Sequence, residues 1–371
     1  MSTQRVDVVV VGAGLAGAAA AWELTNRGYS VVIVEQFEVG HAEGSSHGTS
    51  RIYRRAYLDP FYIRLTGRAE REWDRLEDQA GIALRTRTGG LDAGRLRHPT
   101  ELIGLLRQQG VAAELLPPEE ITERWPGIDL GEPAVFHDQA GYLDAGATVR
   151  TLVGLAVGGG AVLAERCAVE RLSPCADGIV AQTADGSWRA GAAVVAVGSW
   201  LPNLMNGFPS PVVTPRITVK QQEVFHLPRR TDVGDPDAIW PTLVYKDEVE
   251  IYALTSGADG GQRPAYKIGQ FDSVSDTTAD NRDKIIDPVA RAVCLDFAGR
   301  HLPGLEHQPS NEQSCLFTMT ADEDFVIDRI GPIVVASPCS GHGAKFAPLT
   351  GVLIADLVEG GPAVPRFAFR T

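Results

Sequence analysis

Cysteine and histidine are sparse in this sequence, and their spacing excludes two common structural roles. The five cysteines are odd in number and none belongs to a C-x-x-C pair, so we expect neither a disulfide framework nor a zinc site. The eight histidines are scattered, with no H-E-x-x-H pair, and we expect no metal. Unpaired thiols are typical of a reducing cytoplasm. The cysteines are Cys167, Cys175, Cys294, Cys315 and Cys339.

The sequence also lacks an excess of basic residues and any long apolar run. Its formal net charge is −13, which argues against nucleic acids and anionic membranes as partners. No apolar stretch reaches the roughly 18 residues of a membrane span, and the valine-rich start lacks the basic segment of a signal peptide. What remains is an ordinary globular composition, 44% apolar and 22% charged over 371 residues. That length predicts about two domains.

The first 35 residues read as a strand, a glycine turn, a helix and a second strand followed by an acid. The apolar strand at 6–11 ends in G-x-G-x-x-G, with Gly12, Gly14 and Gly17. Such glycines allow a tight turn, close approach of a pyrophosphate and packing of the helix against the sheet. Glu35 follows about 20 residues later, where a carboxylate binds a ribose hydroxyl. The unit predicts a dinucleotide-binding domain, with NAD and FAD equally allowed and NADP disfavoured.

Later segments indicate that this domain is discontinuous, because α/β patterns return after stretches of a different kind. The segments are a helix through 65–76, short strands and proline-containing turns at 86–143, a helix from 145 that the glycines at 158–160 end, a parallel strand at 193–197, alternating strands at 211–315, and α/β character again at 333–358.

Three separated motifs carry a family resemblance. They read G-S-S-H-G-T-S-R-I-Y-R at 44–54, C-L-F-T-M-T followed by acidic residues at 315–328, and S-G-H-G-A-K-F at 340–346. In this order, over nearly the whole chain, they resemble the monomeric sarcosine oxidase and N-methyltryptophan oxidase family, which are flavoprotein amine oxidases of the D-amino-acid oxidase superfamily.

The resemblance implies a fold of the α/β plus α+β class. It consists of a discontinuous, Rossmann-like FAD-binding domain and a substrate domain built on a mixed or antiparallel sheet. We expect the FAD-binding domain to comprise 1–85, 146–211 and 316–371, and the substrate domain to comprise 86–145 and 212–315.

The same resemblance makes FAD the cofactor and matches Cys315 to the thiol that bonds covalently to the flavin 8α-methyl group. A thiolate held against that electron-poor methyl can add to it. Cys339 is a weaker rival, and a plain buried core residue is the other interpretation of Cys315. The residues expected to contact FAD are Gly12, Gly14, Gly17, Glu35, Ser45, Ser46, Arg51, Val169, Gly198, Cys315, Gly341, Gly343 and Lys345.

Four cations match catalytic positions of the family. Arg54 and Lys345 match the pair that holds a substrate carboxylate, one as a bidentate fork and the other as a point charge. Arg51 matches the arginine near the flavin ring, where positive charge stabilises anionic reduced flavin. Lys267, within Y-K-I-G, matches the lysine at which oxygen is reduced. The alternative interpretation of Arg54 and Lys345 is that they form ordinary surface salt bridges. The alternative for Lys267 is that it is a solvent-exposed charge on a strand.

Two aromatic positions depart from the family. Phe271 stands where relatives have an active-site histidine and cannot donate a hydrogen bond. Phe317 stands where sarcosine oxidase has a tyrosine, so the ring stays and the hydroxyl is lost. Both changes favour a bulkier or more aromatic substrate, whereas His342 is expected to be structural. The expected substrate-binding residues are Arg54, Lys345, Tyr252, Phe271 and Phe317.

The resemblance implies oxidation of a secondary or cyclic amine, such as an N-substituted or cyclic α-amino acid, to an imine with reduction of O2 to H2O2. A flavin-dependent biosynthetic dehydrogenase or desaturase with another electron acceptor is the alternative. A third hypothesis is that the protein binds a flavin or nucleotide and has a regulatory role without catalysis. The expected partners are a small-molecule amine and O2, with no nucleic acid or membrane, and we expect a monomer in the cytoplasm.

Overall fold

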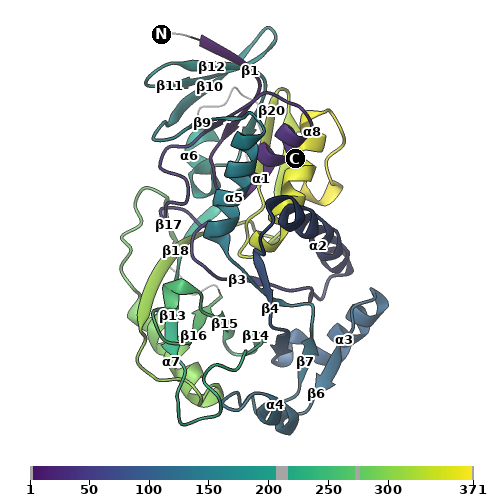
Figure 1. Cartoon of the computed structure of the whole chain (residues 1–371), viewed down its shortest axis with the longest axis vertical. Helices are drawn as coiled ribbons and strands as arrows, with labels where there is room; N and C mark the ends of the chain where they lie inside the picture. Colours follow the sequence, from purple (N-terminus) through teal and green to yellow (C-terminus); the bar gives the residue numbers. More distant parts are fainter. Residues whose placement is uncertain (1–2, 206–215, 272–275, 370–371) are drawn as a thin grey trace.

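The computed structural model describes residues 3–205, 216–271 and 276–369. Two large sheets lie toward opposite ends of the molecule, and a small third sheet lies between them (Figure 1). Each large sheet has its own buried apolar cluster. The predicted class, a Rossmann-like α/β part joined to a part with a mixed sheet, is therefore confirmed.

The eight-stranded sheet is parallel at its centre. Its first strand pairs in parallel with the second strand of the chain and with a strand that follows some 180 residues later in sequence. Val8, Val9 and Val10 are buried because both faces of this sheet are covered. The strands are β1 (Thr3–Val11), β2 (Val31–Val34), β9 (Val162–Ala164), β10 (Val169–Cys175), β11 (Gly178–Thr183), β12 (Ser187–Val195), β19 (Val326–Ile330) and β20 (Ile333–Ser337).

Three helices pack closely beside this sheet. Helix α1 (Leu15–Asn26) contacts both α5 (Ala145–Gly158) and α8 (Ala347–Val358). The run Ala18 to Ala21 is fully buried, because small side chains let the helices approach one another. Helix α1 therefore has its N-terminus fixed at the glycine turn, at the carboxyl end of β1 (Figure 1).

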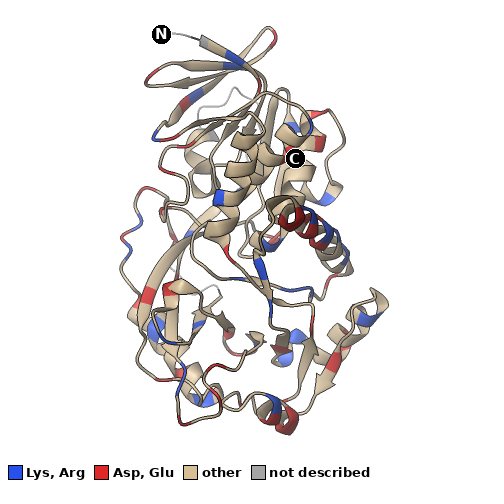
Figure 2. Cartoon of the chain, viewed as in Figure 1, with Lys and Arg blue, Asp and Glu red and all other residues tan. Residues whose placement is uncertain are grey.

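Helix α2 (Pro60–Ala80) confirms the apolar pattern predicted at 65–76. Leu65, Ala69, Trp73 and Leu76 are all buried. Figure 2 shows acidic and basic residues interleaved along the rest of the helix. Asp59 begins it, accepting a hydrogen bond from the backbone N–H of Phe61 at 2.8 Å.

The nine-stranded sheet is mixed. Its pairs are antiparallel except for one parallel pair, between a strand of the 90s and a strand of the 240s. The order is β17 (Asp276–Thr277), β13 (Thr218–Pro228), β16 (Ala265–Gln270), β15 (Glu250–Thr255), β14 (Thr242–Lys246), β5 (Gly90–Ala93), β7 (Ala134–His137) and β6 (Glu114–Leu116), and β18 (Asn311–Met319) also pairs with β13.

The small sheet links the two parts. It is antiparallel and consists of β3 (Arg51–Tyr53), β8 (Gly141–Leu143) and β4 (Arg85–Arg87). Because β3 directly follows the loop at 44–50, this sheet holds that loop between the two large sheets.

Helices interrupt two regions that the sequence predicts to be strands and turns. They begin at prolines, which are accommodated in the first helical turn because the missing N–H has no partner there. Helix α7 is begun by Asp287, whose side chain accepts from the N–H of Val289. These helices are α3 (Pro99–Gln108) and α4 (Pro118–Arg124) within 86–143, and α7 (Pro288–His301) within 211–315; α6 (Leu201–Met205) completes the set in the described ranges.

The division into two domains remains a prediction. Sheet membership follows the expected segments over most of their length, but β18 runs through the expected boundary at 315/316. Cys315, the predicted flavin thiol, lies on this strand at the expected boundary. Among the residues that the structure describes, we find no helix with the length and apolar character of a membrane span.

Candidate active site

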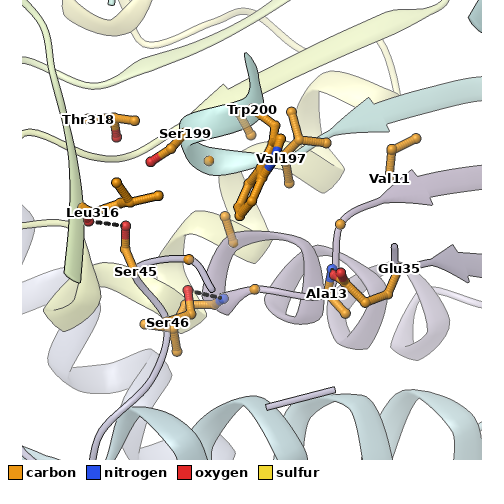
Figure 3. A pocket seen from close by; sticks show the side chains of 18 of the residues that line it. Val11, Ala13, Glu35, Ser45, Ser46, Val197, Ser199, Trp200, Leu316 and Thr318 are labelled. Atoms are coloured by element: carbon orange, nitrogen blue, oxygen red, sulfur yellow. Dashed lines mark hydrogen bonds between the residues drawn. The ribbon is translucent and has the colours of Figure 1, made fainter. Parts of the chain in front are cut away.

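A cavity of about 480 Å³ opens at the carboxyl ends of β1, β2 and β12 (Figure 3). Its lining includes the glycine turn after β1, Glu35 after β2 and the segment 196–200 after β12. The edge of a parallel sheet where strand order changes direction is the usual place for a nucleotide. The predicted elements are thus brought to one cavity.

The glycine turn lacks room for side chains. Gly12 has φ +96°, and a Cβ on Gly17 would lie 1.9 Å from the carbonyl oxygen of Gly12. Gly12 and Gly14 line the cavity, whereas Gly17 does not. Gly17 therefore allows the helix to pack on the turn, and its predicted cofactor contact is indirect.

The first turn of α1 presents backbone N–H groups to the cavity. Gly14 is its N-cap and offers no side-chain acceptor. Ser46 supplies one from the neighbouring loop, accepting from the N–H of Leu15 at 3.0 Å (Figure 3). The remaining N–H groups suit a phosphate.

Glu35 is held by two backbone groups. Its carboxylate accepts from the N–H of Ala13 at 2.7 Å and from the N–H of Phe37 at 2.9 Å, and it is 4% exposed. A carboxylate has about four acceptor positions, so a ribose hydroxyl can still donate to it. The glycine turn, the N-terminus of α1 and the carboxylate of Glu35 together fit the ADP part of FAD.

Other predicted cofactor residues line the far part of this cavity. They include Ser45, whose hydroxyl donates to the carbonyl of Leu316 on β18 (Figure 3). Cys339, the rival thiol, lies here too and accepts from Ser337 at 3.3 Å. The predicted cofactor residues in this cavity are Gly12, Gly14, Glu35, Ser45, Ser46, Arg51, Val169, Gly198, Gly341 and Gly343.

A second cavity of about 410 Å³ adjoins the first. Arg51, Phe317, Gly341 and Ala344 line both. A ligand that extends from the first cavity past these residues therefore reaches the second. The predicted residues that line only the second cavity are Arg54, Tyr252, Lys267, Phe271, Cys315 and Lys345.

Arg54 and Lys345 lie on one aromatic ring at this second cavity. The Arg54 guanidinium carbon is 4.8 Å, and Lys345 Nζ 5.7 Å, from the centre of the Tyr57 ring. Arg54 is 3.7 Å from the buried carboxylate of Asp92. Lys345 is 5% exposed and donates to the carbonyl of His342 at 2.8 Å. Burial and the Arg54 charge hold the pKa of Lys345 well below its usual range.

His342 is fixed as a neutral ring. Its Nε2 donates to the carbonyl of Glu323 at 2.9 Å, since a carbonyl can only accept. Its Nδ1 must then accept from the Tyr57 hydroxyl at 3.1 Å. Burial lowers the pKa of His342 to about 3. Tyr57 was not among the predicted residues, and no local sequence signal marks it.

Lys267 lies at another part of the second cavity. It is on β16, 2% exposed, and donates to the carbonyl of Ser50 at 2.6 Å. Burial first, and then the charge of Arg51, lower its pKa to about 7, against an opposing effect of Asp259. An amine with this pKa changes charge near neutrality, which is a property of functional groups more than of structural ones.

Cys315 lies on β18 and is 5% exposed. Burial raises the pKa of its thiol, while the charges of Arg51 and Lys267 lower it. The adjacent cations therefore offset only part of the rise in pKa, and the thiol form remains favoured in the absence of the flavin.

Aromatic rings form one wall of the second cavity. Phe271 and Phe317 meet edge to face with centroids 6.5 Å apart. Lys246 Nζ lies 4.8 Å from the centre of the Phe271 ring and pairs with Glu250 at 2.6 Å. Tyr252 also contributes to the lining. Lys246 was not predicted, because only the hairpin of β14 and β15 brings it to Phe271.

Comparisons with known proteins agree with this site. A family model for FAD-dependent oxidoreductases matches residues 7–357. The chain is 32% identical to monomeric sarcosine oxidase of Streptomyces avermitilis, covering 95% of this chain and 93% of that protein. It is 30% identical to human peroxisomal sarcosine oxidase, covering 95% and 91%.

Solved structures share the fold. The open form of NikD, described as an unusual amino acid oxidase essential for nikkomycin biosynthesis, superposes with a TM-score of 0.86 at 24% identity, covering 99% of this chain and 98% of that one. L-proline dehydrogenase of P. horikoshii gives 0.84 at 21% identity, covering 98% and 96%. The resemblance found in the three motifs is confirmed, and the chain belongs to the FAD-dependent oxidoreductase family.

Proposed function

We propose that this FAD-dependent oxidoreductase oxidises a secondary or cyclic amine, of the kind found in N-substituted or cyclic α-amino acids, to an imine and reduces O2 to H2O2. The observation that carries the proposal is that the two cavities adjoin and share four lining residues, Arg51, Phe317, Gly341 and Ala344. A flavin bound from the first cavity would present its ring to the second. The sarcosine oxidase relatives support the same chemistry.

The carboxylate of the substrate binds between Arg54 and Lys345. Arg54 offers a planar fork of donors and Lys345 a point charge. Tyr57 supports both cations from beneath. Fixing the carboxylate orients the carbon next to nitrogen, which is worth several kcal/mol when a reaction needs one geometry.

The wall of Phe271 and Phe317 excludes water from the other side of the substrate. When bound, FAD supplies the acceptor for a hydride from the carbon next to nitrogen and passes the two electrons to O2. Phe271 carries no proton, so the substrate amine is oxidised without a base at that position. Arg51 and Lys267 provide positive charge near the junction of the two cavities.

Cys315 is the proposed covalent attachment point. The support is its burial near Arg51 and Lys267 and its place in one of the three motifs that carry the family resemblance. Denaturing mass spectrometry with peptide mapping tests it: the flavin mass stays on the Cys315 peptide. Cys339→Ser is the matched control and retains the attached flavin, whereas Cys315→Ser loses it. Free dissociation of flavin from the wild-type chain refutes the attachment.

Anaerobic mixing with a panel of secondary and cyclic amino acids tests the reaction itself. We expect bleaching of the yellow flavin by at least one member, followed by stoichiometric H2O2 when air is admitted. Bleaching without peroxide, but with turnover on an artificial acceptor, favours the dehydrogenase or desaturase alternative. A flavin that no amine bleaches favours a regulatory protein.

We further propose a cytoplasmic monomer. The five cysteines are all free, as a reducing compartment requires, and four relatives carry the word monomeric in their names. Sedimentation at micromolar concentration checks the mass: a value near 39.7 kDa plus flavin supports the proposal, and twice that value contradicts it.

A further inference from the structure

Lys267 is a buried cation with a single carboxylate beside it. Asp259 Oδ2 lies 3.9 Å from its Nζ, and in the described ranges no other carboxylate is within ion-pair distance of that atom. The two residues come from different elements, since Asp259 lies in the short 3₁₀ turn η3 (Ala258–Gly260). Asp259 lines neither cavity, so it can act on a ligand only through Lys267 or Arg51.

The carboxylate of Asp259 is held rigidly by one threonine. The hydroxyl of Thr49 donates to Oδ1 at 2.6 Å, and the N–H of Thr49 donates to Oδ2 at 3.2 Å. The same hydroxyl oxygen accepts from the N–H of Asp259 at 3.2 Å. Two residues distant in sequence thus satisfy each other, and the carboxylate is 12% exposed as a result.

Arg51 approaches the same carboxylate from another direction. Gly48 has φ +86°, and a Cβ there would lie 3.0 Å from Arg51 Nη1 and 3.2 Å from Asp259 Oδ2. The missing side chain lets both groups occupy this corner. Asp259 therefore lies beside one buried cation, Lys267, and in the same corner as the half-buried Arg51.

The other titratable groups around Lys267 do not substitute for Asp259. His226 and His47 are neutral near pH 7, because burial lowers their pKa values to about 4 and about 3. The Cys315 thiol has a raised pKa. Asp144 acts on Lys267 more weakly than Asp259, and it is occupied as the N-cap of α5.

We propose that Asp259 is a positioning residue for the oxygen half-reaction: its carboxylate keeps Lys267 protonated beside the flavin and so sets the pH range in which the reduced enzyme reacts with O2. The proposal rests on the oxidase function proposed above. Neutralising Asp259 removes the carboxylate beside Lys267 and leaves the opposing effect of the Arg51 charge, so that buried Lys267 loses its proton more readily.

The sign follows from the same charges. The pKa of Lys267 is already lowered to about 7, and Asp259 is one of the groups that raise it. In Asp259→Asn it falls further, so the protonated fraction at neutral pH drops. A fall of one unit makes that fraction about tenfold smaller at any pH above both values. Oxygen reactivity then declines from a lower pH than in the wild type.

The test uses the holoenzyme reduced with dithionite, so that it needs no amine substrate. Reoxidation by O2 is followed by stopped flow from pH 5.5 to 9.5, and the visible spectrum of the oxidised flavin is titrated over the same range. For Asp259→Asn we expect both midpoints to move down by about one pH unit or more, with reoxidation near pH 8 slowed about tenfold. Asp259→Glu restores both midpoints toward the wild-type values.

Thr49→Val and Asp287→Asn complete the set. Thr49→Val keeps the charge but frees the carboxylate, so a smaller shift in the same direction is expected. Asp287→Asn removes an N-cap carboxylate that lines neither cavity and leaves both midpoints in place. Unmoved midpoints in Asp259→Asn and Thr49→Val overturn the proposal, as does a uniform slowing at every pH. Failure of all amines to bleach the flavin would refute the oxidase function. The shift of the spectral midpoint between the wild type and Asp259→Asn would still test whether Asp259 controls the protonation of Lys267.

Discussion

The two buried lysines of the second cavity differ in what neutralises them. Lys267 has Asp259 at 3.9 Å and a carbonyl partner at 2.6 Å. Lys345 has a carbonyl partner at 2.8 Å, the Tyr57 ring and the like charge of Arg54, and the described residues place no carboxylate within 4 Å of it. The charge of Lys267 is therefore balanced by a carboxylate of the protein itself, whereas Lys345 is arranged to bind the carboxylate of a ligand.

This difference separates two kinds of functional cation. A lysine with a carboxylate of the protein beside it does not depend on an anionic ligand to favour its charged form, which suits a small uncharged reactant such as O2. A lysine that faces another cation gains most when a carboxylate arrives. The same residue type thus serves two roles because its surroundings differ.

The largest effect is expected when the internally neutralised lysine is removed. Lys267→Met should slow reoxidation by O2 about 100-fold to 1,000-fold, the usual loss when one preorganised electrostatic group is deleted. Anaerobic reduction by an amine should change only a few-fold, since the substrate carboxylate binds at Lys345. Stopped-flow measurement of the two half-reactions separates them. An equal loss in both would mean that the two lysines are not functionally distinct.

Removing the other lysine should reverse the pattern. Lys345→Met leaves Arg54 alone to hold the carboxylate, a loss of about 2–3 kcal/mol, so kcat/KM for an amino acid should fall roughly 30-fold to 150-fold. Reoxidation of the dithionite-reduced enzyme should be unaffected. Lys246→Met is the matched control, because Lys246 lines the same cavity but is paired with Glu250. A comparable loss in that control would contradict the assignment.

The sequence identified both lysines but not the reason they differ. The glycine turn was predictable because Gly12, Gly14, Gly17 and Glu35 lie within one local strand–turn–helix–strand unit, and the structure brings all of it to one edge. The partner of Lys267 was not predictable in this way. The contact that holds Asp259 joins residues 210 positions apart, and no periodicity or local motif reports such a pairing.

The same limit explains what was missed in the fold. The alternating apolar residues of 211–315 predicted strands and gave no sign of α7, whose start depends on Asp287 and Pro288. By contrast, α2 was predicted from its apolar face alone, because a helix of 21 residues repeats that pattern several times. Long elements with a periodic apolar pattern can be predicted from the sequence, whereas short helices and cross-sheet contacts depend on tertiary packing.

Binding of a simple carboxylate should distinguish the lysines by pH. Burial and Arg54 hold the pKa of Lys345 below its usual range in the free enzyme, and a bound anion raises it. Affinity for acetate should therefore be highest below the free-enzyme pKa, and should weaken by up to tenfold per pH unit as the pH rises from that value toward the pKa in the complex.

Calorimetry in two buffers of different ionisation enthalpy measures the accompanying proton uptake. We expect up to one proton per acetate within that pH window for the wild type and none for Lys345→Met. Asp259→Asn should leave the proton uptake that accompanies acetate binding at Lys345 unchanged. Acetate binding that is independent of pH in the wild type would show that Lys345 does not titrate.

The smallest effect is expected at Tyr57, whose ring contacts both Arg54 and Lys345. In Tyr57→Phe the ring beneath Arg54 and Lys345 remains, but the hydrogen bond to His342 Nδ1 at 3.1 Å is lost. A neutral hydrogen bond contributes about 1 kcal/mol, so KM should rise roughly fivefold while kcat changes little. The reoxidation rate and its pH profile should stay at the wild-type values, because Tyr57 does not contact Lys267. A fivefold loss in reoxidation instead would show that the two ends of the cavity are coupled through this ring, and that the separation between them is incomplete.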